Sequence, residues 1–198
     1  MGIREIIEDI ITLFVLINPI GSIPVFVEIT SKMKKEQRAK TFNIATITAA
    51  AILLVFSVLG QGLLEKIFNI GINDIMIAGG LIMLTISIKS IMFSAVSKEE
   101  LGSKSISDLT AVPMAFPLLV GPGTMVTGVL VLARQGYLKL GLILLILFLC
   151  VWLVVRFSEP LYKLLGEVGA KVLSKVMFVV LAAIATKYIM AGIINYIK

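Results

Sequence analysis

Six apolar stretches, each long enough to cross a bilayer, occupy most of this chain and leave only short polar connections. They lie at about 3–30, 41–64, 74–95, 109–133, 138–157 and 176–197. A transmembrane helix needs about 20 predominantly apolar residues. Charged residues make up only 15% of the 198 residues, whereas an average soluble domain has about 25%. The sequence therefore predicts an all-α membrane protein with six transmembrane helices in one domain, 1–198.

The chain contains no histidine. This removes His-ligated metal and haem sites and catalysis of the Ser-His-Asp or Cys-His type. The net charge of +6 comes from lysines between the spans, which favours a topology signal and contact with lipid headgroups over nucleic-acid binding. We therefore expect no enzyme, no metal, no other cofactor and no nucleic-acid partner, with membrane lipid as a partner.

The distribution of Lys and Arg predicts the orientation in the membrane. The connections after spans 1, 3 and 5 carry eleven: Lys32, Lys34, Lys35, Arg38, Lys40, Lys98, Lys104, Arg156, Lys163, Lys171 and Lys175. The opposite side carries five: Arg4, Lys66, Arg134, Lys139 and Lys198. Because cytoplasmic loops are richer in Lys and Arg, we expect a multi-pass protein of the cell membrane with both termini outside.

Two of the spans are interrupted near their middle by residues that end helices. Proline has no N–H to donate, and glycine adopts backbone conformations closed to other residues. In hydrocarbon an unsatisfied backbone group is costly, so such breaks persist only inside protein or beside a cavity. The interruptions are Asn18, Pro19, Ile20, Gly21 and Ser22 in the first span and Gly121, Pro122, Gly123 and Thr124 in the fourth. Their pairing favours a binding site over two independent proline kinks.

A short half-helix is expected after each break. Ser22 is predicted to cap one over 23–30, and Thr124 another from Met125 to about Ala133. The N-terminus of a helix presents free N–H groups and a partial positive charge, which suit a small carboxylate. The unwound carbonyls ahead of each break suit an ammonium group or a coupling cation.

The two halves of the chain, roughly 1–97 and 106–198, resemble each other. The breaks occupy corresponding positions, and "SIKSIM" in the third span corresponds to "ATKYIM" in the sixth, which aligns Lys89 with Lys187. Because each half has three spans, the second half must be inverted relative to the first. This arrangement of two inverted three-helix repeats, with spans 1 and 4 discontinuous, is common in secondary transporters.

Charged residues within the predicted spans are candidates for coupling. Lys187 lies near the middle of span 6, where a charge is costly, and is a candidate for coupling or for a buried structural charge. Glu28, on the predicted half-helix of span 1, is a candidate proton carrier. Asp9, Asp74 and Asp108 lie near span ends, where we expect them to be solvated at the interface.

Small residues predict where helices approach each other closely. They are Ala45, Ala49, Ala50 and Ala51 in span 2, Ala78, Gly79 and Gly80 in span 3, and Ala182, Ala183, Ala185, Ala191 and Gly192 in span 6. Span 5 has no polar side chain except Cys150, and we expect it to face lipid.

The motifs "NPIGSIPVF" and "AFPLLVGPGTM" together resemble those of the MarC family of integral membrane proteins, which includes the SnatA small neutral amino acid transporters. The resemblance covers the whole chain. It implies transport of glycine, alanine and similar amino acids, driven by a cation gradient, with the substrate held at the two breaks.

We therefore expect a secondary active transporter of small neutral amino acids that works by alternating access with H⁺ or Na⁺ as the coupling ion. The alternatives are an exporter of amino acids or of another small solute, a passive channel, and an accessory membrane protein that transports nothing. The sequence does not specify an oligomeric state.

Overall fold

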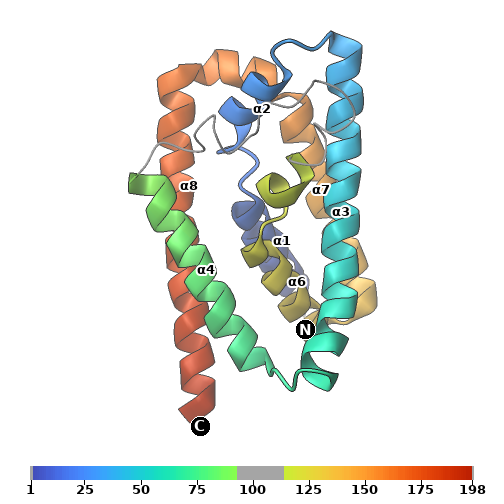
Figure 1. The fold of residues 1–198 in the computed structure, drawn as a ribbon, viewed down its shortest axis with the longest axis vertical. Helices are drawn as coiled ribbons and strands as arrows, with labels where there is room; N and C mark the ends of the chain where they lie inside the picture. The colour runs from blue at the N-terminus through green and yellow to red at the C-terminus, as the bar shows by residue number, and fades with distance from the viewer. Residues whose placement is uncertain (1, 93–113, 198) are drawn as a thin grey trace.

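A computed structural model describes residues 2–92 and 114–197 of the chain, and over these residues the protein is helical with no β-strand (Figure 1). The helices are α1 (Ile3–Ile17), α2 (Ile23–Thr30), α3 (Lys35–Lys66), α4 (Ile72–Met92), the π-helix η2 (Met114–Leu119), α6 (Pro122–Gln135), α7 (Tyr137–Arg156) and α8 (Ser158–Ile197). The predicted all-α class is confirmed. The polar loop at 96–108, with Asp108, lies outside the described residues.

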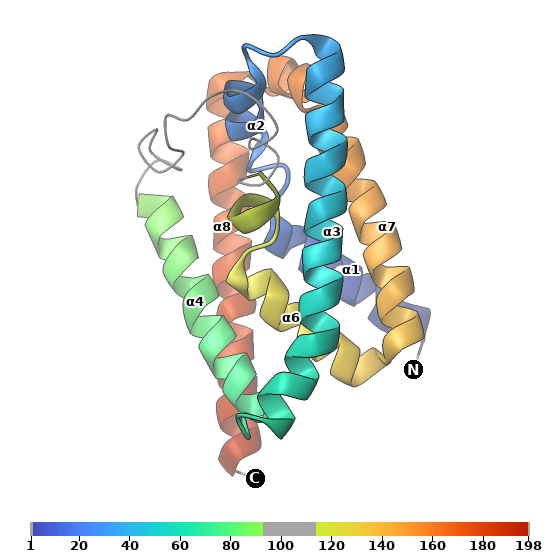
Figure 2. The same cartoon turned by 45° about the vertical axis from the view of Figure 1, so that its right-hand side comes forward.

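Two antiparallel helix pairs frame the molecule, and the interrupted segments lie between them (Figures 1 and 2). In one pair α3 packs against α7, and in the other α4 packs against α8. The chain segments α1, α2, η2 and α6 occupy the space between the pairs. Both termini lie toward the end of the molecule opposite α2 (Figures 1 and 2).

The α4–α8 pair depends on glycine, as the small residues predicted. A Cβ on Gly80 would lie 2.8 Å from the carbonyl oxygen of Ala185, and one on Gly192 would lie 3.0 Å from the carbonyl oxygen of Asn73. These distances leave no room for a side chain between the two backbones. Without a solvent-driven force between helices in lipid, such close packing is a main source of helix association.

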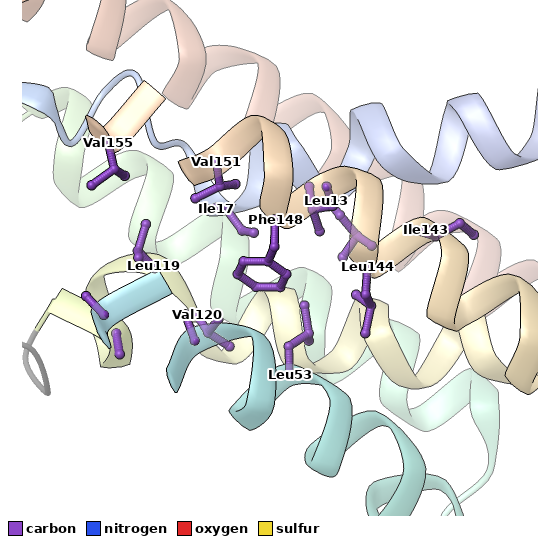
Figure 3. Packing of buried hydrophobic residues seen from close by; sticks show 14 of the residues in the cluster. Leu13, Ile17, Leu53, Leu119, Val120, Ile143, Leu144, Phe148, Val151 and Val155 are labelled. Carbon is purple, nitrogen blue, oxygen red and sulfur yellow. The ribbon is translucent and has the colours of Figure 1, made fainter. Parts of the chain in front are cut away.

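Helix α7 packs one face into the core, so the prediction that span 5 faces lipid is wrong for that face. The buried residues recur at the spacing of one helix face: Leu140, Ile143, Leu144, Leu147, Phe148, Val151 and Val155. Figure 3 shows several of them against side chains of α1, α3 and η2. A uniformly apolar helix has no polar face to reveal which side is buried, and packing against α1 and α3 decides it.

The region between the fifth and sixth predicted spans is helical, where the sequence suggested a loop. Helix α8 begins at Ser158 and contains a sharp turn at Gly166, whose φ of 67° is in the left-handed region that glycine adopts without strain. The part before Gly166 crosses the end of the molecule, and the rest runs along its length (Figure 1). Helix α3 likewise begins at Lys35, ahead of the predicted span.

Within the described ranges, four continuous helices are long and apolar enough to cross a membrane: Lys35–Gly60, Ile72–Met92, Tyr137–Arg156 and Val168–Ile197. They correspond to predicted spans 2, 3, 5 and 6. Predicted spans 1 and 4 are the interrupted ones, and each is divided into two shorter helical pieces. The structure thus places the breaks where the proline and glycine residues indicated.

Candidate functional site

The first break is a turn closed by Asn18. Helix α1 ends at Ile17, and Asn18 follows in the left-handed conformation, with φ 47° and ψ 51°, which asparagine tolerates better than most residues. The Gly21 N–H donates to Asn18 Oδ1 at 3.0 Å, and the Ser22 N–H donates to the Asn18 carbonyl at 3.1 Å. A Cβ on Gly21 would lie 2.4 Å from Asn18 Nδ2, so glycine is needed for the asparagine side chain to fold back.

Helix α2 begins at Ile23 and ends at Thr30, as predicted, with Pro24 in its first turn. The predicted capping by the Ser22 side chain is wrong. Ser22 occupies the N-cap position, but its side chain makes no cap hydrogen bond because its backbone is right-handed helical (φ −86°, ψ −4°) instead of extended. Of the N–H groups from Gly21 to Val25, only that of Val25 finds no acceptor among the described residues.

The second break combines an extended residue with a proline start. Phe116 is extended inside η2 (φ −140°, ψ 129°) because a residue that precedes proline is driven out of the helical region. Gly121 is the N-cap of α6, and Pro122 is its first residue, a position where proline loses no hydrogen bond. The predicted cap at Thr124 is therefore wrong, because Pro122 starts the helix before it.

The first turn of α6 keeps open hydrogen-bond donors. Neither the Gly123 N–H nor the Thr124 N–H has an acceptor in the part of the chain that the structure describes, and no side chain caps this end. Thr124 is only 2% exposed. A Cβ on Gly123 would lie 2.3 Å from Met83 Cγ of α4. Gly123 thus packs against Met83 at the start of α6, while two N–H groups of this turn find no acceptor among the described residues.

The two breaks lie beside each other halfway along the molecule, and α2 and α6 run from them in opposite directions (Figures 1 and 2). Ile17 and Val120, which directly precede the breaks, belong to one buried cluster and lie close to Phe148 in Figure 3. Most of the predicted site residues are buried: Asn18, Pro19, Gly21, Ser22, Gly123 and Thr124. The others are half-buried: Ile20, Gly121 and Pro122.

The two candidate coupling charges lie away from this centre. Lys187 is exposed on α8, so its charge is not buried among the helices, and Glu28 is exposed on α2. The counterpart of Lys187, Lys89, is exposed on α4. The structure brings none of these three side chains to the breaks.

An ion pair between a buried carboxylate and a half-exposed arginine, which the sequence did not indicate, links α1 to α6. Asp9 was expected to be solvated at the interface, but it is only 6% exposed. One carboxylate oxygen accepts from Arg134 Nη2 and the other from Gln135 Nε2, both at 2.9 Å. The sequence did contain a signal, since Asp9 shares a helix face with the buried Leu13 and Ile17 at four-residue spacing.

Comparison with known proteins decides the family. The family model described as "MarC family integral membrane protein" matches residues 3–197. The chain belongs to the MarC family. Among curated relatives, the UPF0056 membrane protein YhcE of Escherichia coli is 34% identical over 92% of this chain and 89% of its own length. No solved structure matches significantly.

Archaeal members of the MarC family are similarly related. A UPF0056 membrane protein of Methanocaldococcus jannaschii is 30% identical over 98% of each chain. One of Archaeoglobus fulgidus is 31% identical over 92% of this chain and 89% of its own. The relatives therefore cover the α1–α2 break, the η2–α6 break and the two framing pairs together, and the chain is an integral membrane protein.

Proposed function

We propose that this MarC-family protein is a secondary active transporter of small neutral amino acids such as glycine and alanine, with its substrate bound between the two breaks. One observation carries the proposal: two half-helices, α2 and α6, follow the two breaks in the interior and run from them in opposite directions. Discontinuous helices that meet near the bilayer midplane form the substrate sites of many transporters.

The open donors assign the substrate carboxylate to α6. The N–H groups of Gly123 and Thr124 find no acceptor among residues 2–92 and 114–197, and the helix dipole adds a partial positive charge at the same place. At the start of α2, Asn18 accepts the hydrogen bonds of the Gly21 and Ser22 N–H groups. Among the described residues, only the Val25 N–H is left as an open donor for a ligand. The two half-helices therefore have different roles, and α6 holds the anion.

The unwound backbone of the first break suits the substrate ammonium group. The carbonyls of Pro19 and Gly21 accept no hydrogen bond from the described residues. Unwound carbonyls of this kind also coordinate Na⁺ in transporters with broken helices, so either the ammonium group or a coupling cation fits. Gly123 packs tightly against Met83, which leaves little room beside the α6 N-terminus and favours a substrate whose side chain is a hydrogen atom or a methyl group.

Alternating access is supported by the arrangement of the helices. The α1–α2 segment pairs with η2–α6, α3 with α7 and α4 with α8, and each long pair is antiparallel (Figure 1). We propose that these are two inverted repeats forming six spans in the cell membrane, with both termini outside. The Asp9–Arg134 ion pair joins the middle of α1 to the end of α6, and on this proposal it must break to open the outer side.

The test is uptake of labelled glycine and alanine into proteoliposomes, with a proton gradient and a sodium gradient imposed separately. We expect saturable uptake that one of the two gradients accelerates. Non-saturable flux would indicate a channel. No flux of any small amino acid in a folded, reconstituted protein would refute transport and favour an accessory membrane protein.

The site is tested with Gly123→Val. The new side chain meets Met83 Cγ and screens the open N–H groups. We therefore expect uptake to fall at least about tenfold, which corresponds to a loss of about 1.4 kcal/mol of binding free energy. Gly62→Val is the matched control, because a Cβ on Gly62 meets no atom within 4 Å. Normal uptake by folded Gly123→Val would place the site elsewhere.

A further inference from the structure

A pocket with an excess of positive charge lies where α3 begins and α7 ends. It has a volume of about 570 Å³, and its charged lining residues are Lys35, Arg38, Arg156 and Glu159. Three cations thus face one carboxylate. The pocket is at the same end of the molecule as α2 (Figure 1), and the sequence assigns this end to the cytoplasm.

The hydrogen bonds in this pocket leave cationic groups without a partner. The Arg38 guanidinium donates to Glu159 and, at 3.2 Å, to the Thr30 carbonyl at the end of α2. Its Nε atom is buried and has no acceptor. Across the described ranges, neither the Lys35 ammonium group nor the Arg156 guanidinium makes a hydrogen bond or an ion pair. A buried donor without an acceptor is costly, so an anion bound in the pocket would be stabilised by these groups.

A separate apolar groove lies on the same two helices, next along them from the pocket. It has a volume of about 690 Å³ and is lined by α3 between Asn43 and Leu54 and by α7 between Gly141 and Trp152. Asn43 directly follows the pocket residue Phe42, and Trp152 lies one helical turn before Arg156. At 1.5 Å per residue the α3 side of the groove is about 17 Å long, close to the roughly 15 Å of one hydrocarbon leaflet.

A polar contact marks the boundary between the pocket and the groove. Trp152 Nε1 donates to Asn43 Oδ1 at 2.8 Å across the two helices. Tryptophan is enriched at the level of the lipid headgroups, where its ring lies in the apolar region and its N–H is polar. On this seam the charged pocket therefore lies at headgroup level and the groove at acyl-chain level.

From this succession of charged pocket and apolar groove we propose that the α3–α7 seam binds one phospholipid with an anionic headgroup. The phosphate and headgroup occupy the pocket and are contacted by Lys35, Arg38 and Arg156, while one acyl chain lies in the groove. A free anion would occupy only the charged pocket and leave the apolar groove unused. A lipid fits better because its headgroup and its acyl chain use both. It fits better than a second copy of the chain because the pocket carries an excess of one charge sign.

The test measures binding of phosphatidylglycerol and of zwitterionic phosphatidylcholine to the full chain in detergent, by native mass spectrometry. We expect tighter binding of phosphatidylglycerol, and the double variant Lys35→Gln/Arg156→Gln should weaken it about 30-fold, since each basic residue near the membrane surface contributes about fivefold. The control Lys32→Gln/Lys40→Gln removes two exposed charges near the same end that do not line the pocket, and it should leave the affinity within about twofold. Equal losses in both would refute a specific site.

The groove is tested separately with Gly141→Leu. A Cβ on Gly141 meets no atom within 4 Å, so leucine fills the groove without a clash, and we expect phosphatidylglycerol binding to fall about tenfold. Gly62→Leu, at a similarly open glycine, should have no effect. Glycerol 3-phosphate that binds as tightly as the lipid would show a free-anion site instead. A dimer that Gly141→Leu dissociates, with lipid binding unchanged, would show a contact between copies.

Discussion

The ion pair between Asp9 and Arg134 leads to an unequal response to two single substitutions. Asp9 is buried, with its side chain 8% exposed, whereas the Arg134 side chain is 54% exposed. If Arg134 is replaced by Gln, the Asp9 carboxylate stays in the protein interior with only the Gln135 amide as partner. If Asp9 is replaced by Asn, the Arg134 guanidinium is already half in solvent and can turn outward.

The sizes of the two effects follow from these exposures. Leaving a buried charge unpaired costs about 3–5 kcal/mol, and we expect Arg134→Gln to fall at the lower end, about 3 kcal/mol, because Gln135 still donates to Asp9. Asp9→Asn loses charge-assisted hydrogen bonds, and we expect about 1–1.5 kcal/mol. The double variant should be more stable than Arg134→Gln alone, since removing the carboxylate removes the unpaired charge.

The free energy of unfolding is measured by titrating the purified protein from mild detergent into sodium dodecyl sulfate and following helix content by circular dichroism. Arg4→Gln is the control, because its ion pair with Glu8 is exposed on both sides and should contribute less than about 1 kcal/mol. Strictly additive losses in the double variant, or equal losses in the two single variants, would refute the account of Asp9 as a buried charge held by Arg134.

Two further substitutions test backbone geometry. Gly80→Leu should separate α4 from α8, because its Cβ would meet the Ala185 carbonyl at 2.8 Å. In the same titration we expect the free energy of unfolding to fall by about 3 kcal/mol or more. An unchanged free energy of unfolding would show that the two backbones are not in contact. Asn18→Ala places alanine at a positive φ and removes the hydrogen bond to Gly21, so it should lower the free energy of unfolding by about 1–3 kcal/mol. Asn18→Gly tolerates the positive φ and should lower it less. The reverse order would mean that the backbone conformation of Asn18 is not the constraint.

The positions of the breaks could be predicted because their causes are local. Proline and glycine restrict or free the backbone wherever they occur, so the start and end of α2 at Ile23 and Thr30 follow from the sequence. The capping residues could not be predicted in the same way. Whether Asn18 or Ser22 closes the turn depends on the backbone conformation of each residue, which is set only when the turn forms.

Contacts between residues far apart in the sequence could not be predicted from the pattern of each span alone. Asp9 is 125 residues from Arg134, and its nearness to a span end suggested solvent. The buried face of α7 was hidden for a related reason, since nearly every residue of that helix is apolar. Its orientation is decided by which helices lie beside it.

The first break is closed by hydrogen bonds to Asn18, whereas the second leaves N–H donors without an acceptor among the described residues. This difference affects how the sequence of each break can vary in evolution. Asn18 and Gly21 are constrained by the geometry of the turn that they form. A substitution at either residue should therefore impair folding, whichever solute the protein binds. At Gly123 and Thr124 the N–H donors find no acceptor among the described residues, so on the proposed function they contribute little to folding and much to the choice of substrate. In the MarC family, new specificities should therefore arise by substitution around the start of α6, while the α1–α2 turn stays the same.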